Sequence, residues 1–176
     1  MIIFINGPFG AGKTTVAKML VKAIPNSMLF DAEDVGYFLR HILNDVERTY
    51  DFQDLAMWRP LVVTTTRLLL ETYQRPLIMP MTIWYRPYFD EVIGGLRQFE
   101  PQFHHFCLTA HKETLIARIQ QRGTSPESFK WCMERNEQVI EAFQSPVFAQ
   151  QINTEEMTPQ EIVDEVLSKV SGNNIL

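Results

Sequence analysis

The sequence predicts an α/β fold, a three-layer sandwich in which helices cover both faces of a five-stranded parallel sheet. Short apolar segments alternate with longer segments of helical periodicity along the chain. The first apolar segment, residues 2–5, is uninterrupted, which is typical of a strand buried on both faces of a parallel sheet. A glycine-rich loop joins this segment directly to an amphipathic helix. In such folds ligands bind at the carboxyl ends of the strands.

The N-terminal unit is the best defined. From residue 13 apolar side chains recur at helical spacing, and Pro25 with Asn26 ends the pattern. A second strand is expected at 27–30, followed by helices at 34–43 and 54–73 with a loop through Tyr50 between them. We expect this largely helical region, about 34–74, to bind the substrate.

The second half continues the alternation. Strands are expected at 76–81, 103–108 and 148–152, with helices at 87–98 and 112–122. Ser125 and Pro126 form a helix start that opens a helix to about residue 143. Thr158 to Glu161 is a capping box with proline at the first helical position, so the last helix begins there. Residues of about 119–135, around a Gly/Thr/Ser/Pro stretch, are expected to act as a lid.

Composition favours a single domain over residues 1–176. The chain is 45% hydrophobic, which is enough to bury a core without disulfide or metal support. Its net charge of −5 and its lack of a Lys/Arg cluster argue against nucleic acid as a partner. Cys107 and Cys132 have no zinc or redox spacing, which favours reduced thiols in a cytoplasmic protein. The N-terminus lacks the features of a signal peptide, and no apolar run reaches the roughly 18 residues of a membrane span.

The glycine-rich loop matches the pattern GxxxxGK[ST] and stands between a strand and a helix, as this pattern requires. Its backbone N–H groups would surround a phosphate at the N-terminus of the helix, and Lys13 would reach the β- and γ-phosphates. The hydroxyl of Thr14 would hold Mg²⁺. We therefore expect a nucleoside triphosphate, ATP with Mg²⁺, to be bound by Gly7, Pro8, Phe9, Gly10, Ala11, Gly12, Lys13, Thr14 and Thr15.

Phosphoryl transfer also requires an acidic group near Mg²⁺ or near the attacking hydroxyl. Asp31, at the end of the second strand, is the candidate for both roles, general base and magnesium ligand. Glu33 and Asp34 stand at a helix start, where capping is the ordinary role of carboxylates, and for Asp34 we favour the cap. The third strand ends in Pro80-Met81-Thr82 without the aspartate that many phosphate-loop enzymes carry there.

Two further sets of residues are candidates. Arg118 and Arg122 lie four residues apart on one helix before the lid, where both can stabilise the transferring phosphate. Their alternative role is a solvated basic face. Polar and aromatic side chains near the carboxyl edge of the sheet are expected to bind a polar, ring-containing substrate. These are Arg40, Trp58, Arg59, Thr82 and Arg86.

The sequence resembles a known family over nearly its whole length. The resemblance rests on INGPFGAGKT at 5–14, on Asp31 with Gly36 and Arg40, on DFQ at 51–53, and on Trp58-Arg59. It continues through PMTI at 80–83, YFDEVIGGLRQ at 88–98, HHFCLTAHKETL at 104–115 with Arg118 and Arg122, and SPVF at 145–148. These stretches are similar to the tunicamycin-resistance ATP-binding proteins, distant relatives of shikimate and nucleoside-monophosphate kinases.

The resemblance implies a P-loop NTPase, kinase-like fold with strand order 2-3-1-4-5, ATP bound across the loop, and protection against tunicamycin, a nucleoside antibiotic. Two functions remain open. One is a Mg-ATP-dependent kinase for a small hydroxylated molecule such as a nucleoside antibiotic. The other is a nucleotide-gated protein that sequesters tunicamycin without phosphorylating it, which the missing third-strand aspartate favours. A sugar, a shikimate-like acid or a nucleoside is a further possible substrate for the same fold.

Overall fold

A five-stranded parallel sheet organises the computed structural model, which describes residues 1–123, 125–148 and 150–172. Its strands are β1 (Ile2–Asn6), β2 (Met28–Leu29), β3 (Leu77–Pro80), β4 (Phe103–Thr109) and β5 (Gln151–Asn153). They are ordered β2-β3-β1-β4-β5, and every neighbouring pair is parallel. The predicted fold class and strand order are therefore confirmed.

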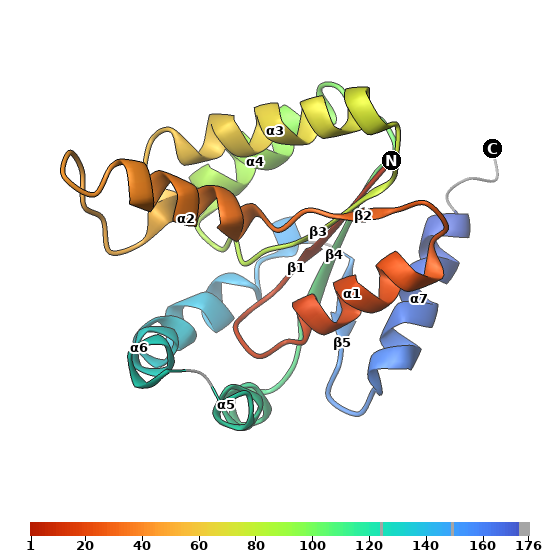
Figure 1. Ribbon diagram of the computed structural model, residues 1–176. Helices are drawn as coiled ribbons and strands as arrows, with labels where there is room; N and C mark the ends of the chain where they lie inside the picture. Colours follow the sequence, from red (N-terminus) through yellow and green to blue (C-terminus); the bar gives the residue numbers. More distant parts are fainter. Residues whose placement is uncertain (124, 149, 173–176) are drawn as a thin grey trace.

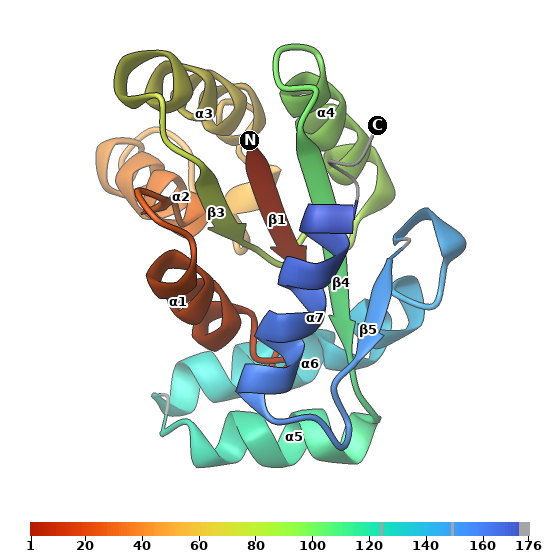
Figure 2. The ribbon, with the colours of Figure 1, turned by 90° about the vertical axis from the view of Figure 1, so that its right-hand side faces the viewer.

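Helices cover both faces of this sheet (Figure 1). One face carries α1 (Lys13–Ala23) and α7 (Pro159–Gly172), and the other carries α3 (Trp58–Tyr73) and α4 (Arg86–Arg97). The remaining helices, α2 (Ala32–Ile42), α5 (Lys112–Gln121) and α6 (Pro126–Ala142), lie toward the carboxyl ends of the strands. Figure 2 shows α5 and α6 beyond the points of the strand arrows. In the part of the chain that the structure describes, no helix has the length and apolar character needed to cross a membrane.

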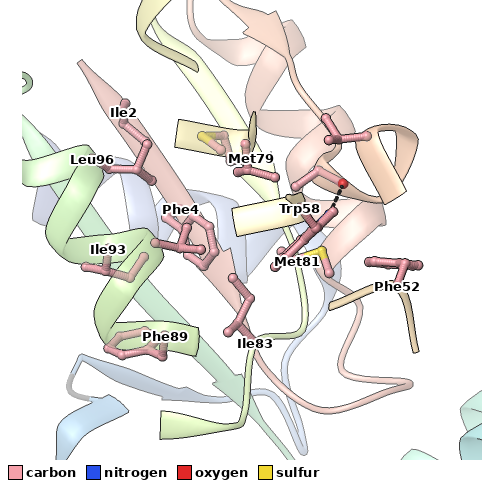
Figure 3. Packing of buried hydrophobic residues seen from close by; sticks show 14 of the residues in the cluster. Ile2, Phe4, Phe52, Trp58, Met79, Met81, Ile83, Phe89, Ile93 and Leu96 are labelled. Carbon is pink, nitrogen blue, oxygen red and sulfur yellow. Dashed lines mark hydrogen bonds between the residues drawn. The ribbon is translucent and has the colours of Figure 1, made fainter. Parts of the chain in front are cut away.

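The core has two halves, one on each face of the sheet. Alternate side chains of β1 supply both, because successive residues of a strand point to opposite faces. Ile2 and Phe4 pack under α3 and α4, whereas Ile3 and Ile5 pack under α1 and α7. Figure 3 shows the first half, in which Phe4 lies between side chains of α4, including Ile93, and two methionines, Met79 in β3 and Met81 just after it. All four of these β1 residues are fully buried, which explains their uninterrupted apolar sequence.

Three predicted boundaries are wrong for local reasons. The second helix begins at Ala32 because Asp31, and not Asp34, is its N-cap: a carboxylate oxygen of Asp31 accepts a hydrogen bond from the Glu33 N–H at 3.0 Å. The helix expected from residue 54 begins at Trp58, because Asp51 instead caps the short 3₁₀ helix η1 (Phe52–Asp54). The last strand begins at Gln151, since Phe148 ends a second 3₁₀ helix, η2 (Pro146–Phe148). Thr124 of the predicted lid and Ala149 of the predicted strand lie outside the described residues.

Candidate active site

The glycine-rich loop has a backbone path that requires glycine at two positions. Gly7 has φ +141° and Gly10 has φ +81°, values that other residues rarely adopt. A Cβ atom at Gly7 would lie 2.3 Å from the Leu108 carbonyl oxygen, and one at Gly10 would lie 2.5 Å from that of Leu115. The loop therefore packs against β4 and α5 by direct backbone contact and ends at the N-terminus of α1, as expected for a phosphate-binding loop.

Lys13 is the first residue of α1 and folds back over this loop. Its ammonium donates a hydrogen bond to the Pro8 carbonyl at 2.8 Å. Burial lowers the pKa of Lys13 to about 8, while the nearby carboxylate of Glu33 opposes that shift. Thr14 and Thr15 follow in the first turn and are exposed. A buried cation beside unpaired helical N–H groups favours a polyanionic ligand.

Two cavities open on either side of the loop. The first cavity, of about 420 Å³, is bounded by the loop, the start of α1, the end of α5 and the start of α7. Its polar side consists of loop backbone with Lys13 and Arg122, and its apolar side includes Met157 and Ile162. A triphosphate with a flat base attached has the same division into polar and apolar parts.

The second cavity, of about 350 Å³, lies between α2, η1, the loop and α6. Its walls hold five aromatic side chains, which are Phe9, Tyr37, Tyr50, Phe52 and Trp131. Phe9 packs edge-on against Trp131 with ring centroids 5.1 Å apart, and Tyr37 packs edge-on against Phe52 at 5.9 Å. Polar lining groups include Glu33, Gln53, Thr82 and Glu127. Aromatic walls with a few polar groups suit an organic ligand that carries a ring.

Arg122 lines both cavities. It is the C-cap residue of α5, immediately before Gly123, so its backbone ends a rigid element while its side chain lies at the junction. A guanidinium at a junction between two ligand cavities can contact a group that passes from one to the other. The role predicted for Arg122 at the transferring phosphate stays a prediction.

Arg118 lines the first cavity, but its guanidinium is already engaged. It donates two hydrogen bonds to Thr154, at 3.0 Å to the hydroxyl and 2.9 Å to the carbonyl. These bonds tie the middle of α5 to the segment between β5 and α7. The role predicted for Arg118 at the transferring phosphate stays a prediction.

The carboxylates after β2 occupy different surroundings. Asp31 is occupied in part by capping α2 and lines neither of the two cavities among the described residues. Glu33, the second residue of α2, lines the second cavity, and its carboxylate accepts a hydrogen bond from the Tyr37 hydroxyl at 3.4 Å. Burial, followed by the charge of Asp31, raises the pKa of Glu33, while Lys13 and Arg122 oppose the shift. Burial likewise raises the pKa of Asp31.

Thr82 connects the second cavity to the phosphate-binding loop. Its hydroxyl donates to the Gly7 carbonyl at 2.9 Å, and its own carbonyl accepts a hydrogen bond from the Gln53 side chain at 2.9 Å. Asn6 makes a parallel link, because its side-chain oxygen accepts from the N–H groups of Gly7 and Ile83. The position after β3 therefore braces the loop.

Of the other residues predicted to bind substrate, Arg40 lines a cavity and Trp58 lies in the core. Arg40 lines the second cavity and donates to the Tyr50 carbonyl at 2.7 Å. Trp58 is fully buried among the core side chains of Figure 3 and donates from its indole to the Ala32 carbonyl at 3.1 Å. The expectation that Trp58 contacts substrate is therefore wrong, because its large side chain fills the core under α2 and has no exposed surface.

Arg59 and Arg86 line neither cavity within the described residues. Arg59 pairs with Glu91 at 2.6 Å and donates to the Gln53 carbonyl at 2.7 Å. Arg86 is exposed and pairs with Asp90, one turn further along α4. Arg59 thus supports a cavity residue from behind.

Sequence reasoning missed several lining residues of the second cavity. Glu33 was interpreted as a helix-end carboxylate because its spacing fits that role equally well. Tyr37 and Trp131 belong to no motif. The only signal for them is helical spacing, which places Tyr37 on the same face of α2 as Glu33 and Trp131 on the same face of α6 as Ser128. Gln53 belongs to the DFQ stretch, which gave no chemical reason for its position.

Two oxygen-bearing side chains near the loop suit magnesium. No group of three or more His, Cys, Asp or Glu side chains that could hold a metal gathers within 1–123, 125–148 and 150–172. Mg²⁺ at phosphate sites needs few protein ligands, because phosphate oxygens and waters complete its coordination. The exposed Thr14 hydroxyl beside the first cavity and the Asp31 carboxylate, which the charge of Lys13 influences, fit this donor set.

Comparison with known proteins agrees with this geometry. The AAA domain family matches residues 3–144. No curated protein sequence gave a significant match. The structure is similar to that of a tunicamycin resistance protein from Deinococcus radiodurans, with a TM-score of 0.80 and 25% identity over 97% of this chain and 95% of that chain.

Two kinases share the fold at lower identity. A sugar kinase from Janibacter has a TM-score of 0.68 and 17% identity, over 97% of this chain and 94% of that chain. A shikimate kinase from Acinetobacter baumannii, in complex with shikimate, has a TM-score of 0.63 and 16% identity, over 99% of this chain and 95% of that chain. These two likenesses concern the fold alone.

Proposed function

The chain belongs to the AAA domain family, and from this membership and its site we propose that it is a Mg-ATP-dependent phosphotransferase. It transfers the γ-phosphoryl group to a hydroxyl of a small, ring-containing molecule. The observation that carries the proposal is the pair of cavities that meet at Arg122, one shaped by a phosphate-binding loop and the other by aromatic side chains. A protein that only bound nucleotide would need the first cavity alone.

In the first cavity the loop N–H groups and Lys13 hold the triphosphate. The base lies toward Met157 and Ile162, beside the Thr154 segment that Arg118 holds in place. Arg122 neutralises charge on the γ-phosphoryl group during transfer. When bound, Mg²⁺ neutralises the phosphate oxygens; Thr14 would hold it, and Asp31 would orient its water.

The acceptor lies in the second cavity, formed largely by the 34–74 region and the proposed lid of about 119–135. We assign the general base to Glu33 and not to Asp31, because Glu33 faces this cavity and Asp31 is used as a helix cap. The acceptor O–H gives its proton to the Glu33 carboxylate while the acceptor oxygen bonds to the γ-phosphorus. The bond from that phosphorus to the bridging oxygen breaks, and ADP leaves with that oxygen.

Tunicamycin is the first acceptor to test, because the similar Deinococcus radiodurans structure is that of a tunicamycin resistance protein. Incubation of protein, ATP, Mg²⁺ and tunicamycin should give a drug species heavier by one phosphoryl group in a mass spectrum, together with ADP. Lys13→Ala should give neither product. A wild-type protein that forms no ADP with tunicamycin, with a sugar, with a shikimate-like acid or with a nucleoside would exclude the transferase.

The second function, a nucleotide-gated protein that sequesters tunicamycin, is favoured by one observation. The second residue after β3 is Thr82, whose hydroxyl donates a hydrogen bond to the loop backbone and which supplies no carboxylate for Mg²⁺. The same mass spectrum separates the two functions. Sequestration predicts unmodified tunicamycin that stays bound to the protein through gel filtration only when ATP is present.

A further inference from the structure

The helix α6 contacts the segment that leads into η1, and both contribute side chains to the wall of the second cavity. At the centre of this contact is Arg135, whose side chain is largely buried at 18% exposure. Its guanidinium carbon lies 4.3 Å from the centroid of the Tyr50 ring and 4.7 Å from that of Trp131. Both rings line the second cavity. One cation therefore contacts two walls that come from distant parts of the chain.

Three polar contacts reinforce this one. The Arg135 guanidinium lies 3.9 Å from a carboxylate oxygen of Asp51, the buried residue that caps η1. The Tyr50 hydroxyl donates to Glu134, the neighbour of Arg135, at 2.6 Å. On the other side, Arg40 donates to the Tyr50 carbonyl at 2.7 Å. Tyr50 is thus fixed at its ring, its hydroxyl and its backbone.

The position of this contact relative to the proposed chemistry matters. Trp131 packs against Phe9 of the phosphate-binding loop, so the wall that Arg135 supports continues to that loop. Asp51 caps the helix that presents Gln53, which in turn is bonded to Thr82 and so to the Gly7 carbonyl. A shift of Arg135 would therefore move the walls of the second cavity, whereas none of the three residues that it contacts, Tyr50, Asp51 and Trp131, lines the first cavity.

We propose that Arg135 is a positioning residue for the acceptor: it latches α6 to residues 50–53 and thereby holds the Tyr50 and Trp131 rings that orient the acceptor toward Arg122. The inference rests on the proposed function, because it takes the second cavity as the acceptor site. A flat guanidinium can stack on two rings and face a carboxylate at once, whereas a lysine ammonium keeps the charge but cannot stack in this way. Both properties are needed for the latch.

The test compares Arg135→Ala and Arg135→Lys with the wild type. Arg67→Ala serves as a matched control, because Arg67 is an exposed α3 residue that pairs only weakly, at 4.0 Å, with Glu71. Hydrogen exchange of residues 44–53 is measured first and needs no acceptor. We expect faster exchange there in Arg135→Ala, a smaller increase in Arg135→Lys, and no change in Arg67→Ala.

Kinetics and binding give the second readout. With tunicamycin as acceptor, Arg135→Ala should raise the acceptor KM about tenfold, as expected for loss of cation–π contacts. Its kcat should change much less, and the affinity for Mg-ATP, measured by calorimetry, should not change. Arg135→Lys should give an intermediate KM.

Each outcome has a defined meaning. Unchanged exchange at 44–53 in Arg135→Ala would overturn the latch, whether or not phosphate is transferred. A wild-type KM and exchange in Arg135→Lys would overturn the requirement for stacking. A loss of Mg-ATP affinity in folded Arg135→Ala would contradict a role confined to the acceptor. Absence of ADP in the wild type would instead overturn the proposed function, and exchange alone would then decide whether the latch exists.

Discussion

At the scale of single residues, the site depends on how burial changes the acid-base properties of a few side chains. Lys13, Asp31 and Glu33 lie near one another, and each has a pKa shifted by desolvation. Their charges compensate in part, which is why a buried ammonium is tolerated beside the loop. The two carboxylates differ in geometry: one caps a helix and the other faces a cavity.

This difference predicts unequal effects of two matched substitutions. Glu33→Gln removes the proposed base and should lower kcat for phosphoryl transfer by about 10²- to 10⁴-fold, with little change in Mg-ATP affinity. Asp31→Asn retains a capping oxygen and should raise the Mg²⁺ concentration needed for half-maximal activity more than it lowers kcat at saturating Mg²⁺. The measurements are ADP formation at varied Mg²⁺ and calorimetric titration with ATP. A larger kcat loss in Asp31→Asn would return the base to Asp31.

The lowered pKa of Lys13 should make nucleotide binding depend on pH. The pKa of about 8 means that Lys13 loses its proton as the pH rises through that value, whereas a bound triphosphate favours the charged form. Mg-ATP affinity should therefore be greatest below pH 8 and fall above it. Folding stability changes in the opposite direction, since burial of the charged form costs stability below pH 8 and this cost disappears as the pH rises.

Calorimetry in buffers of different ionisation enthalpy measures this proton directly. Near pH 8.5 the wild type should take up protons when it binds Mg-ATP. Lys13→Ala, compared at protein concentrations that compensate for its weaker binding, should show less uptake. Equal uptake in both proteins would assign the proton to another group.

At the scale of elements, close contacts between helices and loops depend on small residues at particular places. Gly36 of α2 faces the Phe52 ring, where a Cβ atom would lie 2.4 Å away, so α2 and η1 approach closely behind the second cavity. Two adjacent glycines in α4 differ in the space that surrounds them. A Cβ atom at Gly94 would meet nothing within 4 Å, whereas one at Gly95 would lie 2.9 Å from both methyl carbons of Val63 on α3.

The two α4 glycines therefore provide an internal control for packing. Gly94→Ala should raise the free energy of unfolding by about 0.5–1 kcal/mol, because it reduces the conformational freedom of the unfolded chain without a clash. Gly95→Ala should lower it by about 1–3 kcal/mol, because Val63 is stiff and α3 must move away. Urea unfolding followed by circular dichroism measures both. Equal changes in the two variants would contradict the close α3–α4 contact.

At the scale of the whole molecule, the sheet brings three distant segments to one edge. Neighbouring β1, β3 and β4 all end there, so the loop after β1 is braced by Thr82 and Asn6 on one side and by the β4 backbone at Leu108 on the other. The loop is thus fixed before any ligand binds. The walls of the second cavity, by contrast, come from α2, η1 and α6, which are joined mainly through side chains. We therefore expect the phosphate side to be rigid and the acceptor side to adjust.

The strand order followed from the family resemblance. The sequence by itself determined the parallel sheet covered by helices and the phosphate-binding loop. These features depend on local patterns: uninterrupted apolar strands, helix caps, and a motif whose glycines are required by the backbone. It also indicated Arg122 and Arg40 as candidate site residues, although it could not show which cavity each would line.

Only the tertiary structure decided that Glu33, and not Asp31, lines the second cavity, and it placed Trp58 in the core. It also joined Arg135 to Tyr50 and Trp131. These outcomes depend on how helices far apart in sequence pack together. The sequence cannot separate Glu33 from Asp31, because both carry the same charge and both fit a helix start. A helix start specifies that a carboxylate is favourable there, but the packing of α2 against the loop and α6 determines which one reaches the ligand.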